Sequence, residues 1–108
     1  MIKVRFYVGG GRYKGFEITG HSGSAENGRD IVCAAVSSAA IMTANTVSEI
    51  CKAPAEIAYD DDGYLKLILQ QDSDELQNLL KGFDLHVREL AKQFPKNIKI
   101  IYGGSQNA

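Results

Sequence analysis

The stretch that decides the fold is DSDELQNLLKGFDLHVRELAKQF, residues 72–94. Its apolar side chains recur at intervals of three and four residues, which is the period of one face of an α-helix. Asp72 and Glu75 have the spacing of a capping box, and Pro95 ends the pattern. The apolar stripe consists of Leu76, Leu79, Leu80, Phe83, Val87, Leu90, Ala91 and Phe94. A stripe of this length predicts a helix that covers a hydrophobic core.

Strand patterns lie on both sides of this helix. Residues 1–8, MIKVRFYV, alternate between apolar and polar, and a glycine-rich turn separates them from a second strand, KGFEITG, at 14–20. Residues 55–69, AEIAYDDDGYLKLIL, form a second hairpin whose turn contains Asp-Gly at 62–63. NIKIIY at 97–102 is the last strand.

A second helix is predicted between the two hairpins. Asp30 opens it, its small and apolar residues recur at threes and fours, and Pro54 ends it. The element order is therefore ββαββαβ, an α+β fold with a five-stranded sheet packed with two main helices. The length of 108 residues corresponds to one domain, which we take as 1–108.

Composition and charge exclude several classes of protein. The chain has 12 basic and 13 acidic residues, a net charge of -1, and no block of like charges that would follow a phosphate backbone, so direct nucleic-acid binding is not expected. No apolar run approaches the length of a membrane span, and the N-terminus lacks the pattern of a signal peptide. A cytoplasmic protein without membrane contact is expected.

The two cysteines are predicted to lie on one helix, about 27 Å apart at 1.5 Å per residue. Cys33 and Cys51 therefore cannot form a disulfide within the chain or share a metal ion. His86 has no partner at zinc-finger spacing, and the run of aspartates at 60–62 is typical of a solvated turn. No metal or other cofactor is predicted, and Cys51 and His86 are interpreted as structural.

The segment TGHSGSAENGRDIVCAAVSS, residues 19–38, carries the candidate chemistry. With Asp30 as N-cap, Cys33 is the third residue of the helix, where unpaired N–H groups and the helix dipole favour a thiolate. His21 directly follows a strand and can supply the base. A lone helical cysteine is usually a small buried residue, but this combination favours thiol catalysis.

GHSG followed by GRDIVCAAVS resembles the signature of the ribosomal-processing cysteine proteases, the Prp family or YsxB-like proteins. The resemblance covers the whole chain in length and element order. It implies a catalytic dyad of His21 and Cys33, with Gly20, Gly28, Asp30 and Ser37 as supporting residues. Many members carry alanine where this chain has Ser22. Asp30 is interpreted as a helix cap, with a third catalytic role as the alternative, and Ser37 lies one turn after Cys33 on the same helix face.

The resemblance also implies what the enzyme acts on. It implies an endopeptidase that removes a short N-terminal extension from a large-subunit ribosomal protein, acts as a homodimer, and closes a loop over the peptide. The loop comprises Ser22, Gly23, Ser24, Ala25, Glu26 and Asn27. Two other functions stay open: a ribosome-associated module that binds peptides without cleaving them, and a redox sensor that uses the exposed thiol.

Overall fold

The computed structural model describes residues 1–20, 30–60 and 63–104. The order ββαββαβ is confirmed, with a π-helical turn, η1, continuing the first helix. The elements are β1 (Ile2–Gly9), β2 (Arg12–Thr19), α1 (Ile31–Asn45), η1 (Thr46–Ile50), β3 (Ala55–Tyr59), β4 (Leu65–Leu69), α2 (Asp74–Gln93) and β5 (Ile98–Gly103).

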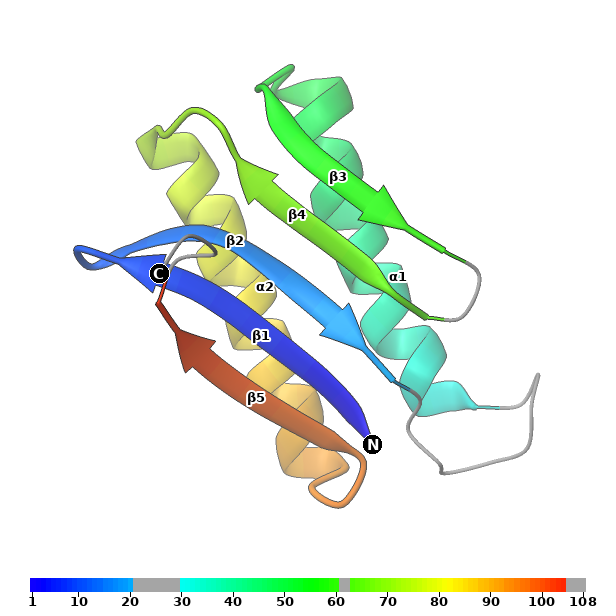
Figure 1. The fold of residues 1–108 in the computed structure, drawn as a ribbon. Helices are drawn as coiled ribbons and strands as arrows, with labels where there is room; N and C mark the ends of the chain where they lie inside the picture. Colours follow the sequence, from blue (N-terminus) through cyan, green and yellow to red (C-terminus); the bar gives the residue numbers. More distant parts are fainter. Residues whose placement is uncertain (21–29, 61–62, 105–108) are drawn as a thin grey trace.

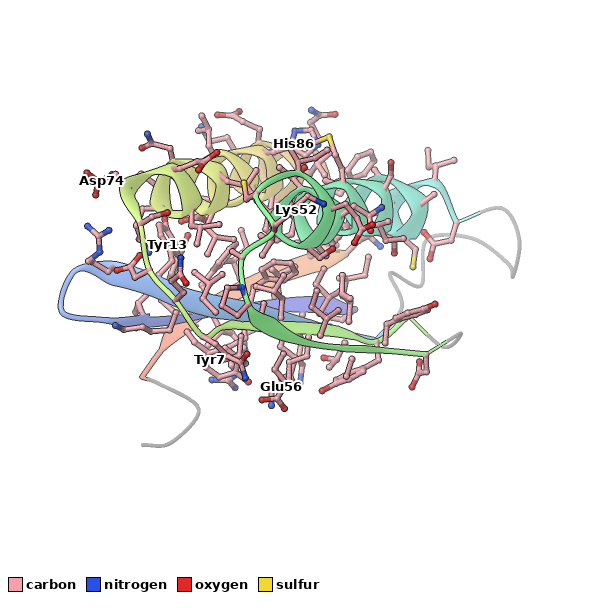
Figure 2. The ribbon with its side chains drawn as sticks, turned by 90° about the horizontal axis from the view of Figure 1, so that it is seen from above. Tyr7, Tyr13, Lys52, Glu56, Asp74 and His86 are labelled. Atoms are coloured by element: carbon pink, nitrogen blue, oxygen red, sulfur yellow. The ribbon has the colours of Figure 1, made fainter. Side chains whose placement is uncertain are left out.

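The five strands form one mixed sheet in the order β3-β4-β2-β1-β5. Strand β5 runs parallel to β1, and the other neighbours are antiparallel. Both helices cover the same face of the sheet, with α1 over the β3–β4 side and α2 over the β1–β5 side (Figure 1). The opposite face carries no helix, and the labelled side chains of Tyr7 and Glu56 project from it (Figure 2).

The core lies between the sheet and the two helices, as the alternation of β1 and the stripe of α2 predicted. Phe6, Phe16 and Phe83 form an aromatic cluster in which the rings of Phe16 and Phe83 are 4.6 Å apart. Val32 and Val36 of α1 are fully buried against the same sheet. Burial of each such side chain contributes about 1.5–3 kcal/mol relative to exposure.

A buried carboxylate attaches α2 to two strands. Asp84 accepts hydrogen bonds from the hydroxyls of Tyr13 on β2 and Tyr102 on β5, the latter at 2.6 Å, and Arg88 pairs with it at 3.3 Å. Burial and the Asp84 carboxylate raise the pKa of Tyr13 to about 12. These contacts orient the helix on the sheet because a buried carboxylate needs its partners.

The start of α2 differs from the predicted capping box by one residue. The N-cap is Ser73, whose hydroxyl accepts from the Leu76 N–H at 3.1 Å. Asp72 instead accepts from Arg12 at 2.6 Å and from the side-chain amide of Gln77 at 2.9 Å. The carboxylate that was expected to cap the helix is therefore paired with Arg12, a residue of β2 that is distant in sequence.

The segment Ile31–Ile50, α1 with η1, is long and apolar enough to cross a membrane by length and composition alone, although serines interrupt it. Six of its residues are buried: Val32, Val36, Ala40, Thr43, Ala44 and Val47. Its outer side remains apolar, since Ile41, Met42 and Ile50 are more than half exposed. The segment is thus a core helix with a second apolar surface.

Candidate active site

The first turn of α1 holds Cys33 in the predicted position. Asp30 has extended backbone angles, and its carboxylate accepts from the Cys33 N–H at 2.9 Å, so it is the N-cap. Cys33 is the third helical residue and is partly buried against the core. Among the described residues, none accepts a hydrogen bond from the N–H of Ile31 or Val32, which are therefore available to a ligand.

The end of β2 explains one of the motif glycines. Gly20 has φ +86, and a Cβ at this position would lie 2.4 Å from the carbonyl oxygen of Met1. Only glycine adopts this backbone angle readily and tolerates such close approach. Strand β2 ends beside the start of α1, so the residues that precede and follow the His21 segment lie at the same end of the molecule (Figure 1).

Part of the predicted site lies outside the described residues. This applies to His21, to Gly28 and to the loop Ser22–Asn27. The structure therefore describes the cysteine, the cap and the strand end, while the pairing of imidazole and sulfur stays a prediction.

A cleft of about 380 Å³ runs along α1 from Ser37 to Ser48. Ser37 is one turn after Cys33, and the residues that line the cleft continue along that same face of the helix. The opposite wall comes from β2, β3 and β4. The lining residues are Ile18, Ser37, Ala40, Ile41, Ala44, Asn45, Ser48, Ile57, Tyr59, Asp60, Gly63, Tyr64 and Leu65.

The cleft is lined mainly by apolar side chains. Hydroxyl and amide groups lie among them at intervals, which is the usual composition of a site for an organic ligand. Ile57 and Tyr59 of the edge strand β3 are exposed beside it. The sequence did not predict that β3 and β4 would form a wall of the cleft. The alternation in 55–69 indicates two strands, but it does not indicate which helix these strands face.

The remaining candidates lie elsewhere. Cys51 follows η1, at the opposite end of the helical segment from Cys33, and its thiol contacts Glu75 at 3.5 Å. Burial and the Glu75 carboxylate raise the pKa of the Cys51 thiol. His86 is exposed on α2 and points away from the sheet (Figure 2), and its interpretation as a residue outside the chemistry stays a prediction. Its side chain takes no part in the core.

A thiol in the first turn of a helix, beside a groove suited to a peptide, is the arrangement of a cysteine protease. Residues 1–99 match the family model described as cysteine protease Prp. The chain belongs to this family, as its motifs indicated, and is a cysteine endopeptidase.

Similar proteins agree with this assignment. The ribosomal processing cysteine protease Prp of Staphylococcus aureus is 29% identical over 85 residues, which cover 77% of this chain and 80% of that protein. A crystal structure of Prp from S. aureus with a covalently linked product peptide has a TM-score of 0.88 and 26% identity, covering 95% of this chain and 100% of that one. The structure of SMU.848 from Streptococcus mutans has a TM-score of 0.81 and 31% identity, covering 98% and 96%.

Proposed function

We propose that this protease removes a short N-terminal extension from a large-subunit ribosomal protein, in the cytoplasm, with Cys33 as nucleophile and His21 as general base. The observation that carries the proposal is the cleft, which begins one turn from Cys33 and follows the helix face that bears it. The relative from S. aureus is named a ribosomal processing protease, and one of its structures holds a covalently linked product peptide.

The dimensions of the cleft fit an extended peptide. From Ser37 to Ser48 the helix rises about 16 Å at 1.5 Å per residue. An extended chain rises about 3.3 Å per residue, so about five substrate residues span that length. The apolar walls select apolar side chains in this part of the substrate.

The reaction follows from the groups at the helix end. The Cys33 sulfur attacks the carbonyl carbon of the scissile bond, and the oxyanion accepts hydrogen bonds from the N–H groups of Ile31 and Val32 at the start of the helix. His21 takes the thiol proton and transfers it to the departing amine. Water, deprotonated by His21, then hydrolyses the thioester and releases Cys33.

Cleavage of a synthetic peptide tests the proposal. The peptide carries the extended N-terminus of the ribosomal protein, and mass spectrometry locates the cut. Wild type should cleave it, Cys33→Ala should not, and Cys51→Ser, which also removes one thiol, should cleave it almost normally. Binding of the peptide without cleavage by wild type would support the peptide-binding module instead.

A bulky side chain inside the cleft tests where the substrate lies. Ser48→Trp places an indole among the cleft walls, while Asn78→Trp adds the same group to the exposed surface of α2. KM should rise in Ser48→Trp alone, because only this variant obstructs the peptide. Equal KM values for the two variants would place the peptide elsewhere.

We also propose that two copies associate through the outer side of α1 and η1. Met42 and Ile50, which lie outside the cleft, are 62% and 76% exposed and form an apolar surface that association would bury. Met42→Glu should shift the protein from dimer to monomer in light scattering after size exclusion. A dimer of unchanged stability in that variant would contradict this interface.

A further inference from the structure

The open face of the sheet collects positive charge. The register places Lys3, Arg5, Lys66 and Lys99 on this face, against the carboxylates of Glu17 and Glu56. Lys14, at the irregularity between β1 and β2, is the fifth cation, since its side chain lies 3.6 Å from where a Cβ on Gly9 would be. The whole chain, by contrast, has a net charge of -1. Five of the twelve basic residues but only two carboxylates are thus assigned to this face, which gives it a local excess of positive charge.

Four of these residues form a stripe along β1. Lys3 pairs in register with Lys99 of β5, and Arg5 follows two positions along the same strand. The guanidinium of Arg5 reaches across β5 to Gly103: a Cβ added to this glycine would lie 3.1 Å from a guanidinium nitrogen. The side chain of Lys14 lies over Gly9, where an added Cβ would be 3.6 Å from the lysine Cε. We call Lys3, Arg5, Lys14 and Lys99 the cationic stripe, and it spans about 20 Å at 3.3 Å per residue.

The stripe forms no ion pair with the part of the chain that the structure describes. Among residues 1–20, 30–60 and 63–104, none forms an ion pair with any of its four side chains. Lys66 and Glu17 are engaged separately, since Lys66 lies 5.9 Å from the centre of the Tyr7 ring and Glu17 accepts from the hydroxyl of Tyr64. Glu17 also lies opposite Arg5 in the register of β1 and β2 and offsets part of that charge, whereas Lys3 lies between Thr19 and Lys99.

The pairing of Lys3 with Lys99 is a cost to the fold. Like charges directly opposite on neighbouring strands are destabilising, and both lysines are exposed. A ligand that carries negative charge would relieve the repulsion between these two lysines. That relief would add to the free energy of binding. A ligand with charges along its length suits a regular row of cations.

We propose that the cationic stripe binds the phosphate backbone of RNA. Among the described residues, Met1 apart, none of the exposed large apolar side chains lies on this face, so it lacks the groups that enter a lipid surface. Tyr7 is nearly buried beneath Lys66 and offers no stacking platform, so contact is to phosphates and independent of base sequence.

The location of the stripe suits an enzyme that works on a ribosomal protein. Lys3 and Lys99 lie near the starts of β1 and β5, at the end of the sheet where β2 ends beside α1 (Figure 1). RNA on the open face leaves the cleft accessible, because the cleft is on the helix side. The absence of runs of like charge argued against nucleic acid in the sequence, but the sheet assembles this stripe from separate strands.

Binding of a fluorescein-labelled uridine oligonucleotide, followed by fluorescence anisotropy, tests the proposal. Neutralising four phosphates of a single strand gives a salt exponent of about 2.8, so affinity should fall about fiftyfold between about 50 and 200 mM salt. In Lys3→Gln/Lys99→Gln two contacts remain, and the same change in salt should weaken binding only about sevenfold. At about 50 mM salt this variant should bind roughly tenfold or more weakly than wild type.

A matched variant controls for net charge. Lys81→Gln/Lys92→Gln removes the same charge from the exposed surface of α2 and should bind the oligonucleotide like wild type. Both variants should cleave the ribosomal peptide normally, which separates this surface from the protease site. Equal losses in the two variants, or no binding by wild type at low salt, would overturn the proposal. Stripe-dependent binding to phosphatidylglycerol vesicles or polyglutamate, but not to RNA, would overturn it in favour of those ligands.

Discussion

Replacing Asp30 separates its capping role from a catalytic one. Its carboxylate accepts from the Cys33 N–H at 2.9 Å and so holds the first turn of α1 together. Alanine removes this acceptor, while asparagine keeps an oxygen in the same place and loses only the charge. Asparagine caps helices about as well as aspartate, so the two substitutions form a matched pair.

The expected loss of stability follows from the cap. Loss of an N-cap side chain costs about 0.5–2 kcal/mol, typically about 1 kcal/mol. The entropy of unfolding is about 2.1 cal/mol/K per residue, which for this chain converts 1 kcal/mol into a fall in Tm of about 4 °C. Asp30→Asn should lose less, about 0.3–1 kcal/mol, because the capping oxygen is kept while the interaction of the charge with the helix dipole disappears.

Activity then distinguishes the two roles. If Asp30 is only a cap, Asp30→Asn should keep kcat/KM within a few-fold of wild type. Asp30→Ala should fall further, because a loosened first turn misplaces Cys33 and the N–H groups beside it. Thermal unfolding followed by circular dichroism gives Tm, and a fluorogenic peptide gives kcat/KM.

Two outcomes would refute this reasoning. An unchanged Tm in Asp30→Ala would show that the cap contributes nothing to stability. A normal Tm in Asp30→Asn together with a loss of activity of about 10⁴, the size seen when the carboxylate of a catalytic triad is replaced, would make Asp30 a third catalytic member.

Three further predictions concern other parts of the molecule. Gly20→Ala should lower Tm and peptide cleavage together, since a methyl group would meet the Met1 carbonyl at positive φ; an unchanged Tm would contradict this. The Arg12 guanidinium and the Gln77 amide lower the pKa of Asp72 to about 2. The stabilising effect of the ionised Asp72 is therefore complete above about pH 4 and is lost as pH falls towards 2. Over that range the Tm of Asp72→Asn should decline less than the Tm of wild type. Parallel plots of Tm against pH for the two proteins would disprove the effect. Cys33 should react with iodoacetamide at neutral pH much faster than Cys51, whose pKa Glu75 and burial raise; peptide mapping measures both rates, and equal rates would argue against an activated thiol.

The elements of the fold could be read from local patterns. The apolar stripe of 76–94 and the alternation of 2–8 specify a helix and a strand because each period repeats within a few residues and needs no distant partner. The position of Cys33 was predictable for the same reason, since its cap is three residues away. Gly20 was recognised from its motif, and the structure adds the physical reason, which is the close approach of Met1.

Contacts between segments distant in sequence decided the rest. Asp72 does not cap α2, because Arg12, sixty residues away, pairs with it in the folded chain and Ser73 takes its place. The cleft exists only where α1 faces three strands that come before and after it in the sequence. The pairing of Lys3 with Lys99 likewise appears only when β5 adds beside β1. The alternation of a strand's sequence determines which face of the sheet each side chain occupies. Strand order and register, which depend on the folded chain, determine which side chains become its neighbours.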